Sequence, residues 1–431
     1  MAETNHFHIP VDVPRGQSGP VCLLAVVSLA ALLCLSAPAR AESEVHDASV
    51  RAWSEFTREL EAAGLAALAS YPQPTTLDTT EGVRYLLQQL GSAIKHQLVR
   101  EQGVIPLLRV GATTINKWGM DGADCKYQGA PIDPEGRYLF SGHLGSARLT
   151  AIQLSNMNSE SYQAFGSLTG DQLQAAADTG EFQVLLAANK PEDWQGPWLA
   201  LEPGTTDLLV REYFGDWGQE RPGQFHLQRL DSTPVKPLLT LPAAEQLLTD
   251  TVATFARRVP QWQSYIERAR QHLVNKIVMR KTAQGLDTNY YGSAWFRIDK
   301  GKALLIEMAD PQALMWSVQL GNVWWESLDY INHTASYNDH QAVVSNDGVF
   351  RFILSQKDPG VPNWLDPVGH SEGALLFRIQ GAASAVQPSI RLVSVDNLSA
   401  LLPPDTATVA TEARLAEIEA RRTHAAIRWA P

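Results

Sequence analysis

The stretch FQVLLAANKPEDWQGPWLALEPGTTDLLVR (182–211) decides the fold, because FRFILSQKDPGVPNWLDPVGHSEGALLFR (350–378) can be laid over it. Both begin with an aromatic strand, continue through a proline-rich loop to Trp-Leu, and end in a Leu-Leu-x-Arg segment. The overlay predicts two β-sandwiches built on one plan. It matches two pairs of residues: Trp198 with Trp364, and Arg211 with Arg378.

Around these stretches, short runs alternate between apolar and polar residues and are separated by Gly, Pro, Asp and Asn turns, as in antiparallel sandwiches. Apolar residues at helical spacing instead predict helical regions over 44–70 and 243–282. They also predict a helix that begins at Asp78 and Glu81, which form a capping-box-like pair. The tail is a charged, Ala-rich helix, which we interpret as a solvated or edge-packing element. Helix, strands, helix, strands predicts an α+β fold with two antiparallel, jelly-roll-like β-sandwich regions and accompanying helices.

The chain is divided into six predicted regions. These are a signal peptide (1–41), an N-terminal helical region (42–110), a first β-sandwich (111–235), a helical linker (242–283), a second β-sandwich (285–395) and a C-terminal helical tail (396–431).

The N-terminus has the pattern of a signal peptide. Arg15 precedes an apolar run at 21–37, and Ala39-Arg40-Ala41 supplies small residues for cleavage before Glu42. The run is short for a membrane span of about 20 residues, and Pro38 ends it, although an uncleaved anchor is the alternative. We therefore expect a periplasmic or secreted protein with no stable membrane insertion after cleavage.

Charge and cysteine content narrow the class of partner. The chain has a formal net charge of −11, which argues against binding to nucleic acid or anionic membranes. Cys125 is the one cysteine outside the predicted leader, so no intramolecular disulfide is expected. Without zinc spacings or a nucleotide fingerprint, the sequence predicts no metal and no cofactor. A small-molecule ligand or substrate is the expected partner, and the oligomeric state is left open.

The segment Gly369-His370-Ser371-Glu372-Gly373 spells the G-x-S-x-G pentapeptide of serine hydrolases. A nucleophile elbow needs a strand that enters the turn and a helix that leaves it. Here the entering segment holds two prolines, and the leaving segment, ALLFRIQ, has the composition of a strand. We therefore interpret the match as accidental.

Three segments carry a family resemblance: KWGMDGADCKYQGAPIDPEGRYLFSGHLGSARL (117–149), LEPGTTDLLVREYFGDWGQERPGQFHLQRL (201–230) and SNDGVFRFILSQKDPGVPNWLDPVGHSEGALLFRIQ (345–380). The chain resembles the bacterial family catalogued as domain of unknown function 1214. The resemblance implies a sandwich or jelly-roll fold, frequent export and an association with the catabolism of hydrophobic compounds, but no reaction. Where relatives often carry Asp-Asn-Pro-Asp, this chain has Asp121-Gly122-Ala123-Asp124.

The densest group of chemically capable side chains lies near residue 370. His370 titrates near neutrality and is the predicted general base or acid, with Asp366 to orient it. Arg378, on the following strand, is the third predicted catalytic residue and can hold a carboxylate or sulfate. We expect His370 at the rim of a cleft, within reach of the other two. The alternative is a turn-rich structural loop in which His370 contacts backbone carbonyls.

Four residues are predicted to bind substrate: Asn363, Trp364, Arg211 and Trp217. Two functions follow from these groups. The first is a cofactor-independent acid/base enzyme, a hydrolase or lyase, acting on a small hydrophobic or cyclic compound in catabolism. The alternative is a non-catalytic ligand-binding or scaffold protein. The polar group around His370 favours the first, and the absence of a complete catalytic motif favours the second.

Overall fold

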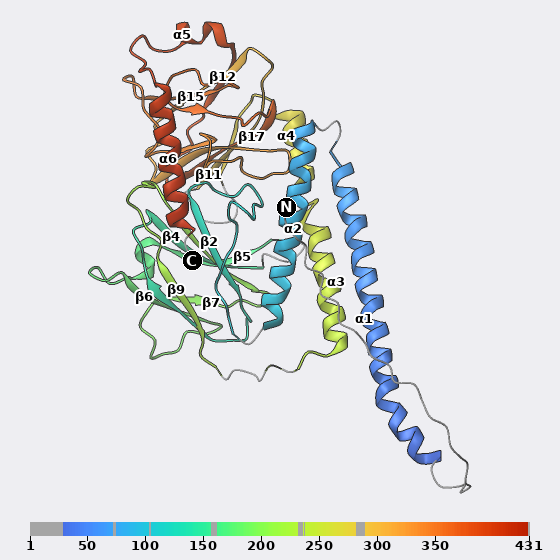
Figure 1. The fold of residues 1–431 in the computed structure, drawn as a ribbon. Coiled ribbons are helices and arrows are strands. Elements are labelled where there is room, and N and C mark those ends of the chain that lie inside the picture. The colour runs from blue at the N-terminus through green and yellow to red at the C-terminus, as the bar shows by residue number, and fades with distance from the viewer. Residues whose placement is uncertain are drawn as a thin grey trace, which may run out of the picture. The chain divides into compact units, whose positions relative to one another are not determined.

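The computed structural model describes residues 29–71, 75–102, 105–156, 162–231, 236, 238–281 and 289–429. Contacts divide the chain into Met1–Arg51 and Ala52–Pro431, and the second unit holds both sandwiches (Figure 1). Residues 1–28 of the predicted signal peptide lie outside the described residues, and its last part belongs to α1 (Leu29–Ala69). Among the helices of the described part, none is both long enough and apolar enough to cross a membrane.

The first sandwich has two sheets. Its strands are β1 (Arg109–Val110), β2 (Cys125–Pro131), β3 (Tyr138–His143), β4 (Leu149–Ser155), β5 (Ala164–Thr169), β6 (Glu181–Ala187), β7 (Trp198–Ala200), β8 (Asp207–Tyr213) and β9 (Gln224–Arg229), with a short 3-10 helix η1 (Gly170–Leu173). One sheet has the order β1-β2-β8-β4-β5 and the other β7-β6-β3-β9. All neighbours are antiparallel except β6 and β7.

The second sandwich repeats this plan. Its strands are β10 (Val278–Lys281), β11 (Tyr290–Arg297), β12 (Lys302–Ala309), β13 (Met315–Gly321), β14 (Ser336–Asn338), β15 (Val349–Leu354), β16 (Trp364–Leu365), β17 (Glu372–Gln380) and β18 (Ser389–Ser394), followed by η2 (Val395–Asn397). The sheet orders are β10-β11-β17-β13-β14 and β16-β15-β12-β18, with β15 and β16 parallel. The α+β fold with two mostly antiparallel sandwiches is therefore confirmed.

The register confirms the internal overlay residue by residue. Arg211 lies on the central strand β8 and faces Tyr127 of β2, while Arg378 lies on the central strand β17 and faces Tyr291 of β11. The two tryptophans also match, since the indole of Trp198 donates to the carbonyl of Ala187 and that of Trp364 donates to the carbonyl of Ser355, both at 2.9 Å. One supersecondary unit thus occurs twice in the chain.

Two edge strands fall outside the predicted sandwich ranges. β1 lies in the stretch predicted as the N-terminal helical region, and β10 lies in the predicted helical linker. They occupy corresponding edges of the two five-stranded sheets. Strands of two and four residues are too short for an alternating pattern to be recognised, so the sequence could not reveal them.

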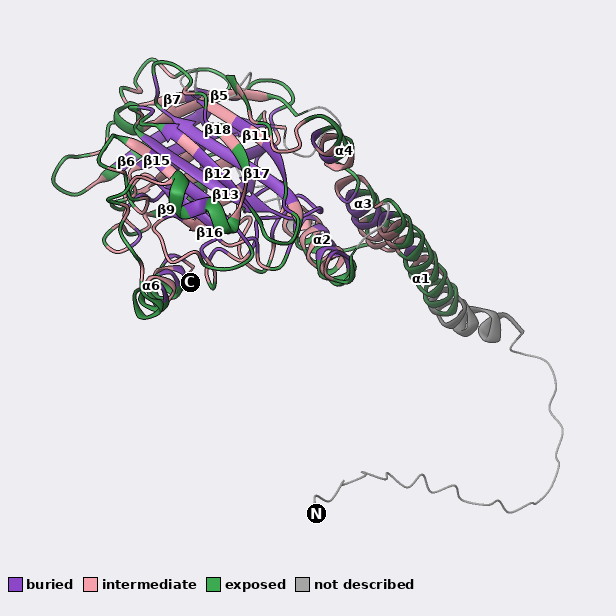
Figure 2. Cartoon of the chain, turned by 90° about the horizontal axis from the view of Figure 1, so that it is seen from above, coloured by how far each residue is buried: buried purple, intermediate pink, exposed green. Residues whose placement is uncertain are grey.

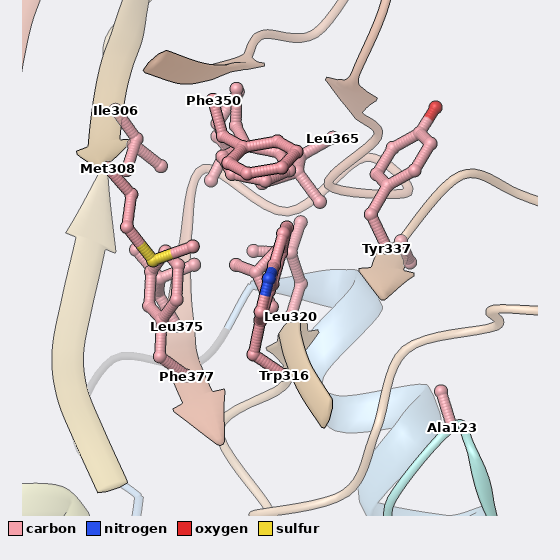
Figure 3. Close-up of a cluster of buried hydrophobic side chains, with 14 of the residues drawn as sticks. Ala123, Ile306, Met308, Trp316, Leu320, Tyr337, Phe350, Leu365, Leu375 and Phe377 are labelled. Carbon is pink, nitrogen blue, oxygen red and sulfur yellow. The ribbon is translucent and has the colours of Figure 1, made fainter. Parts of the chain in front are cut away.

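Alternation along the strands builds a separate core in each sandwich. In the second, apolar side chains of β13 and β17 pack with those of β12 and β15 between the two sheets. Figure 2 colours much of β12, β13 and β17 as buried. Figure 3 shows Trp316 at the centre of this core, edge-on to Phe350 with ring centroids 4.7 Å apart. Residues that alternate with these point to the outer faces of the sheets.

Five further helices accompany the sandwiches: α2 (Thr76–Gln102), α3 (Leu241–Arg258), α4 (Gln263–His272), α5 (Leu398–Leu401) and α6 (Thr411–Arg428). The predicted cap of α2 is wrong by one turn. Thr75 and Asp78 make the reciprocal hydrogen bonds, with the amide of Thr75 donating to Asp78 at 3.0 Å and the amide of Asp78 donating to the Thr75 hydroxyl at 3.1 Å. Glu81 is thereby free to pair with a distant histidine.

The C-terminal helix α6 is anchored rather than solvated. Arg414, Arg421 and Arg428 recur every seven residues, which places them on one face of the helix. All three are buried, at 5%, 3% and 4% exposure. Charged side chains in a tail usually indicate a solvated face, and here they instead reach backbone carbonyls and aromatic rings of the body.

Candidate functional site

His370 lies in the turn before β17 and is buried, with 3% of its surface exposed. Its Nε2 lies 2.8 Å from Oε2 of Glu81 on α2, and its Nδ1 lies 2.9 Å from the carbonyl oxygen of Pro367. The expected position at a cleft rim is therefore wrong. Both ring nitrogens face acceptors, so the charged imidazolium that donates from both fits this geometry.

The His370–Glu81 pair stays ionised because its members stabilise each other. Burial alone would lower the pKa of His370, but the hydrogen bond and charge of Glu81 outweigh burial and raise that pKa. Burial alone would raise the pKa of Glu81. The hydrogen bond and charge of His370, together with a hydrogen bond from Asn322, outweigh burial and lower that pKa. The pair ties α2 to the turn before β17, which is a structural role.

Asp366 does not orient His370. Its Oδ2 lies 2.8 Å from Nδ1 of His333, and its Oδ1 accepts from the amide of Val368 at 2.8 Å. The predicted pairing fails because the turn from 366 to 370 directs the two side chains to different neighbours. Ser371 is exposed and leads directly into β17, so a strand leaves the turn, as the analysis of the pentapeptide predicted.

Three of the predicted substrate-binding residues have structural partners. Asn363 is 4% exposed, adopts a left-handed φ of 56°, and bonds the backbone of Val343 and the carbonyl of Arg351. The indole of Trp364 donates to the carbonyl of Ser355 in the second sandwich. Trp217 is 5% exposed and donates to Asp124 at 2.8 Å, with Arg428 stacked on its ring. Asn363 also lines a small pocket of about 180 Å³, but its side-chain amide is already bonded to the backbone.

The two remaining arginines lie on the outer faces of the five-stranded sheets. Nη1 of Arg211 donates to Oε1 of Gln153 at 2.9 Å, and Nη1 of Arg378 donates to Oε1 of Gln319 at 2.9 Å. Gln153 is on β4 and Gln319 is on β13, the strands next to the two arginines. Each glutamine follows by two positions the residue that pairs with the arginine in the strand register. The duplication has therefore produced two equivalent Arg–Gln pairs.

The two pairs share one set of neighbours. Tyr127 and Tyr291 interact electrostatically with both guanidinium groups, and both guanidinium groups act on Tyr213. Met315 of β13 packs with residues of β2, β4 and β8, which brings the outer faces of the two sheets together. We call this group the inter-sandwich arginine site: Tyr127, Gln153, Arg211, Tyr213, Tyr291, Gln319 and Arg378.

The charges at this site are unbalanced. Within the described residues, neither Arg211 nor Arg378 forms an ion pair with a carboxylate. Asp121 and Asp124 also act on Arg378 without forming an ion pair with it. Each has a stronger partner, since Asp121 interacts with Lys117 and accepts from Ser327, and Asp124 interacts first with Arg428. Burial raises the pKa of Tyr213, so it remains a neutral hydroxyl that supplies no negative charge.

The two halves of the site differ in access. Arg378 is 9% exposed and also donates to the carbonyl of Met120, so this half is closed. Arg211, Tyr127 and Tyr291 each keep part of their surface exposed. The hydroxyl of Tyr162, at the edge, donates to the same Gln153 oxygen at 3.0 Å. The Arg211 half is therefore the more exposed of the two.

Sequence reasoning missed the glutamines and tyrosines of the site. A signal for the glutamines existed, because each lies between two apolar residues of a buried strand, in AIQL (151–154) and SVQL (317–320). An uncharged polar residue at the same place in both copies of a repeat indicates a shared outer face. The tyrosines carry no comparable signal, since aromatic residues are common in strands.

A separate pocket of about 340 Å³ lies beside α2 and α4. Aromatic side chains dominate its lining, including Tyr71, Tyr85, Trp262 and Trp324. The hydroxyl of Tyr85 donates to the carbonyl of Val259 at 3.0 Å, and that of Tyr71 donates to Glu372 at 3.2 Å. With these hydroxyls engaged, the pocket offers mainly stacking surface, and Glu267 is the one carboxylate in its lining.

Comparison with solved structures supports the fold. An uncharacterised protein from Burkholderia cenocepacia is similar, with a TM-score of 0.74 and 28% identity over 81% of this chain and 98% of that chain. A protein from Vibrio parahaemolyticus matches 72% of this chain and 98% of its own with a TM-score of 0.40 and 12% identity, too distant to carry an argument. No protein-family model and no curated protein matches the chain. The resemblance to domain of unknown function 1214 stays a prediction.

Proposed function

We propose that the protein binds a small organic anion at the inter-sandwich arginine site, with a carboxylate on a compact apolar or cyclic body. One observation carries the proposal: the duplication places two guanidinium groups in one environment, and within the described residues neither is hydrogen-bonded to a carboxylate. Arginine donors match the geometry of a carboxylate, and a buried cation is stabilised by a counter-charge. Tyr127, Tyr213 and Tyr291 supply aromatic surface for the body of such a ligand.

We favour binding over the hydrolase or lyase activity expected from the sequence. The predicted base, His370, is buried, and both of its ring nitrogens already contact acceptors. A general base must reach the proton that it removes, directly or through one water. The catabolic association implied by the family resemblance is compatible with a protein that captures an organic acid without transforming it.

The test uses benzoate as the probe and calorimetry as the measurement. We expect benzoate to bind the full chain, and Arg211→Gln to weaken it by roughly 10- to 150-fold, since a charge-assisted hydrogen bond contributes about 1.5–3 kcal/mol. Arg391→Gln removes an exposed guanidinium on β18 and is the matched control. Benzamide, which lacks the charge, should bind weakly. Equal affinities for benzoate and benzamide, or an unchanged Kd in Arg211→Gln, would contradict an anion site.

We also propose that the protein is exported and that its leader is removed. The supporting feature is the order of Arg15, the apolar run at 21–37 and Ala39-Arg40-Ala41. Expression in a bacterium, followed by periplasmic extraction and N-terminal sequencing, should yield a chain that begins at Glu42. A product that begins at Met1 in the soluble fraction would refute cleavage, and a full-length membrane-bound product would support the anchor.

A further inference from the structure

A second group of cations surrounds His96, outside the inter-sandwich arginine site. α2 contributes Lys95 and Arg100, β1 contributes Arg109, and the end of α3 contributes Arg257 and Arg258. The positive charges of all four arginines act on His96, and Lys95 interacts electrostatically with Arg109. We call these five cations with His96 the His96 cluster. Such a concentration of positive charge is unexpected in a chain whose net charge is −11.

One carboxylate reaches the cluster from β8. Oδ2 of Asp207 lies 3.6 Å from Nη2 of Arg100, beyond hydrogen-bond distance, and the charge of Asp207 also acts on Arg109. Among the described residues, Asp207 is the one carboxylate among the charges that act on Arg109, and no carboxylate acts on Arg258, so one negative charge faces these two guanidinium groups and Arg100. The cluster therefore keeps an excess of positive charge that a bound anion would offset.

His96 receives more donors than it can accept. Nε of Arg100 lies 2.9 Å from Nε2 of His96, and Nη2 of Arg109 lies 3.2 Å from Nδ1. A guanidinium only donates, and a neutral imidazole accepts at one nitrogen only. Burial and the surrounding arginines lower the pKa of His96 to about 3, so the ring is neutral at pH 7. In one of the two contacts, a guanidinium N–H therefore faces the imidazole N–H, and no hydrogen bond forms there.

Three buried guanidinium nitrogens complete the pattern. Nη2 of Arg100, Nε of Arg109 and Nε of Arg258 have no hydrogen-bond partner among the described residues. They come from α2, β1 and α3, three elements that converge on His96. The ring of Trp118 lies 4.5 Å from the guanidinium carbon of Arg258 and holds that side chain in place. Buried donors without acceptors are destabilising, and the oxygens of an oxyanion are acceptors.

We propose that the His96 cluster binds a tetrahedral oxyanion, either free phosphate or sulfate or the phosphate group of a small phosphorylated compound. Unpartnered guanidinium donors from three neighbouring elements, on a cationic background, are the chemistry that recognises phosphate oxygens. The exposed Lys95 and the partly exposed Arg100 mark the side from which the anion enters. A bound anion would join α2, β1 and α3, and so fix the linker helix to the first sandwich. The site uses no residue of the inter-sandwich arginine site.

Calorimetric titration with inorganic phosphate at pH 7 and constant ionic strength tests the site. We expect phosphate to bind, and Arg109→Gln and Arg258→Gln each to weaken it about tenfold or more. Two variants on different elements keep the test decisive if one of them fails to fold. Arg391→Gln, with an exposed guanidinium on β18, should match the parent protein. An unchanged Kd for phosphate in the folded Arg109→Gln or Arg258→Gln variant would overturn the proposal.

Two further arms assign the ligand and the location. Phenyl phosphate that binds more tightly than inorganic phosphate indicates a phosphorylated compound, and equal affinities indicate a free oxyanion; both agree with the proposal. Arg211→Gln should leave phosphate binding unchanged. Loss of phosphate binding in that variant would place the anion between the sandwiches and overturn a site at His96, whereas failure of benzoate to bind would affect only the proposed function.

Discussion

Replacing Glu81 with alanine is expected to lower the free energy of unfolding by about 3–5 kcal/mol, because it leaves His370 buried without its counter-charge. The side chains of His370 and Glu81 are 2% and 11% exposed, so water cannot replace the lost partner. The Asn322 amide also loses one acceptor, Oε2 of Glu81 at 3.0 Å, and keeps the other, Oε2 of Glu326 at 3.3 Å. Urea unfolding of the parent and the variant measures the difference.

His333→Ala is the matched control, since His333 also pairs with a carboxylate at 2.8 Å but is 38% exposed. We expect that change to cost no more than about 1 kcal/mol, as exposed pairs contribute little. A similar small cost for Glu81→Ala would show that the His370–Glu81 pair does not hold α2 to the sandwich. It would also reopen a chemical role for His370.

The same pair predicts a pH dependence. The pKa of His370 is raised above 6.5, so its contribution is complete below about pH 6.5 and is lost as the pH rises through the folded value. The pKa of Glu81 is lowered below 4.5, so its contribution is complete above about pH 4.5 and is lost as the pH falls through the folded value. The stability difference between the parent and Glu81→Gln should therefore be largest between pH 4.5 and 6.5. A flat profile from pH 4 to 8 would refute an ionised pair.

Replacing Arg421 with alanine is expected to lower the free energy of unfolding by about 3 kcal/mol. Its Nη2 donates to the carbonyl of Ser336 at 2.8 Å and its Nη1 to the carbonyl of Tyr330 at 3.3 Å. The guanidinium also lies 5.1 Å from the ring centroid of Tyr337. The substitution removes both donors and the packing of α6 against the ring, so thermal melting and urea unfolding should both report a large loss.

The adjacent Arg422 provides the control for this change. It lies on the same helix, is 51% exposed and pairs with Glu419, so Arg422→Ala should alter stability by no more than about 0.5 kcal/mol. Equal effects of the two substitutions would mean that α6 lies on the surface without a specific anchor. Of the two interpretations of the tail, a solvated or an edge-packing helix, the solvated one would then hold.

The three residues predicted to act together in catalysis have separate partners in the structure. His370, Asp366 and Arg378 lie within thirteen residues along the chain, and nearness in sequence suggested that they act together. The turn and strand separate them, so that His370 meets Glu81, Asp366 meets His333 and Arg378 meets Gln319. Partners 289, 33 and 59 residues away cannot be inferred from local spacing.

The sequence by itself determined the duplicated sandwich plan. Strand alternation, turn residues and the matched Trp and Arg positions of 182–211 and 350–378 are local properties, and they specify which side chains point into each core. The equivalent registers of Arg211 and Arg378 follow from that repeat. These features were therefore predictable before any three-dimensional contact was known.

Only the tertiary structure decided what covers the outer faces of the sheets. An alternating strand predicts one face toward its own core, but it does not say whether the other face meets water or a second sheet. Here the outer faces of β8 and β17 meet, which brings Arg211 and Arg378 into one environment. The same reason applies to α6, where the charges of Arg414, Arg421 and Arg428 suggested solvent until the body of the protein supplied their carbonyl and aromatic partners.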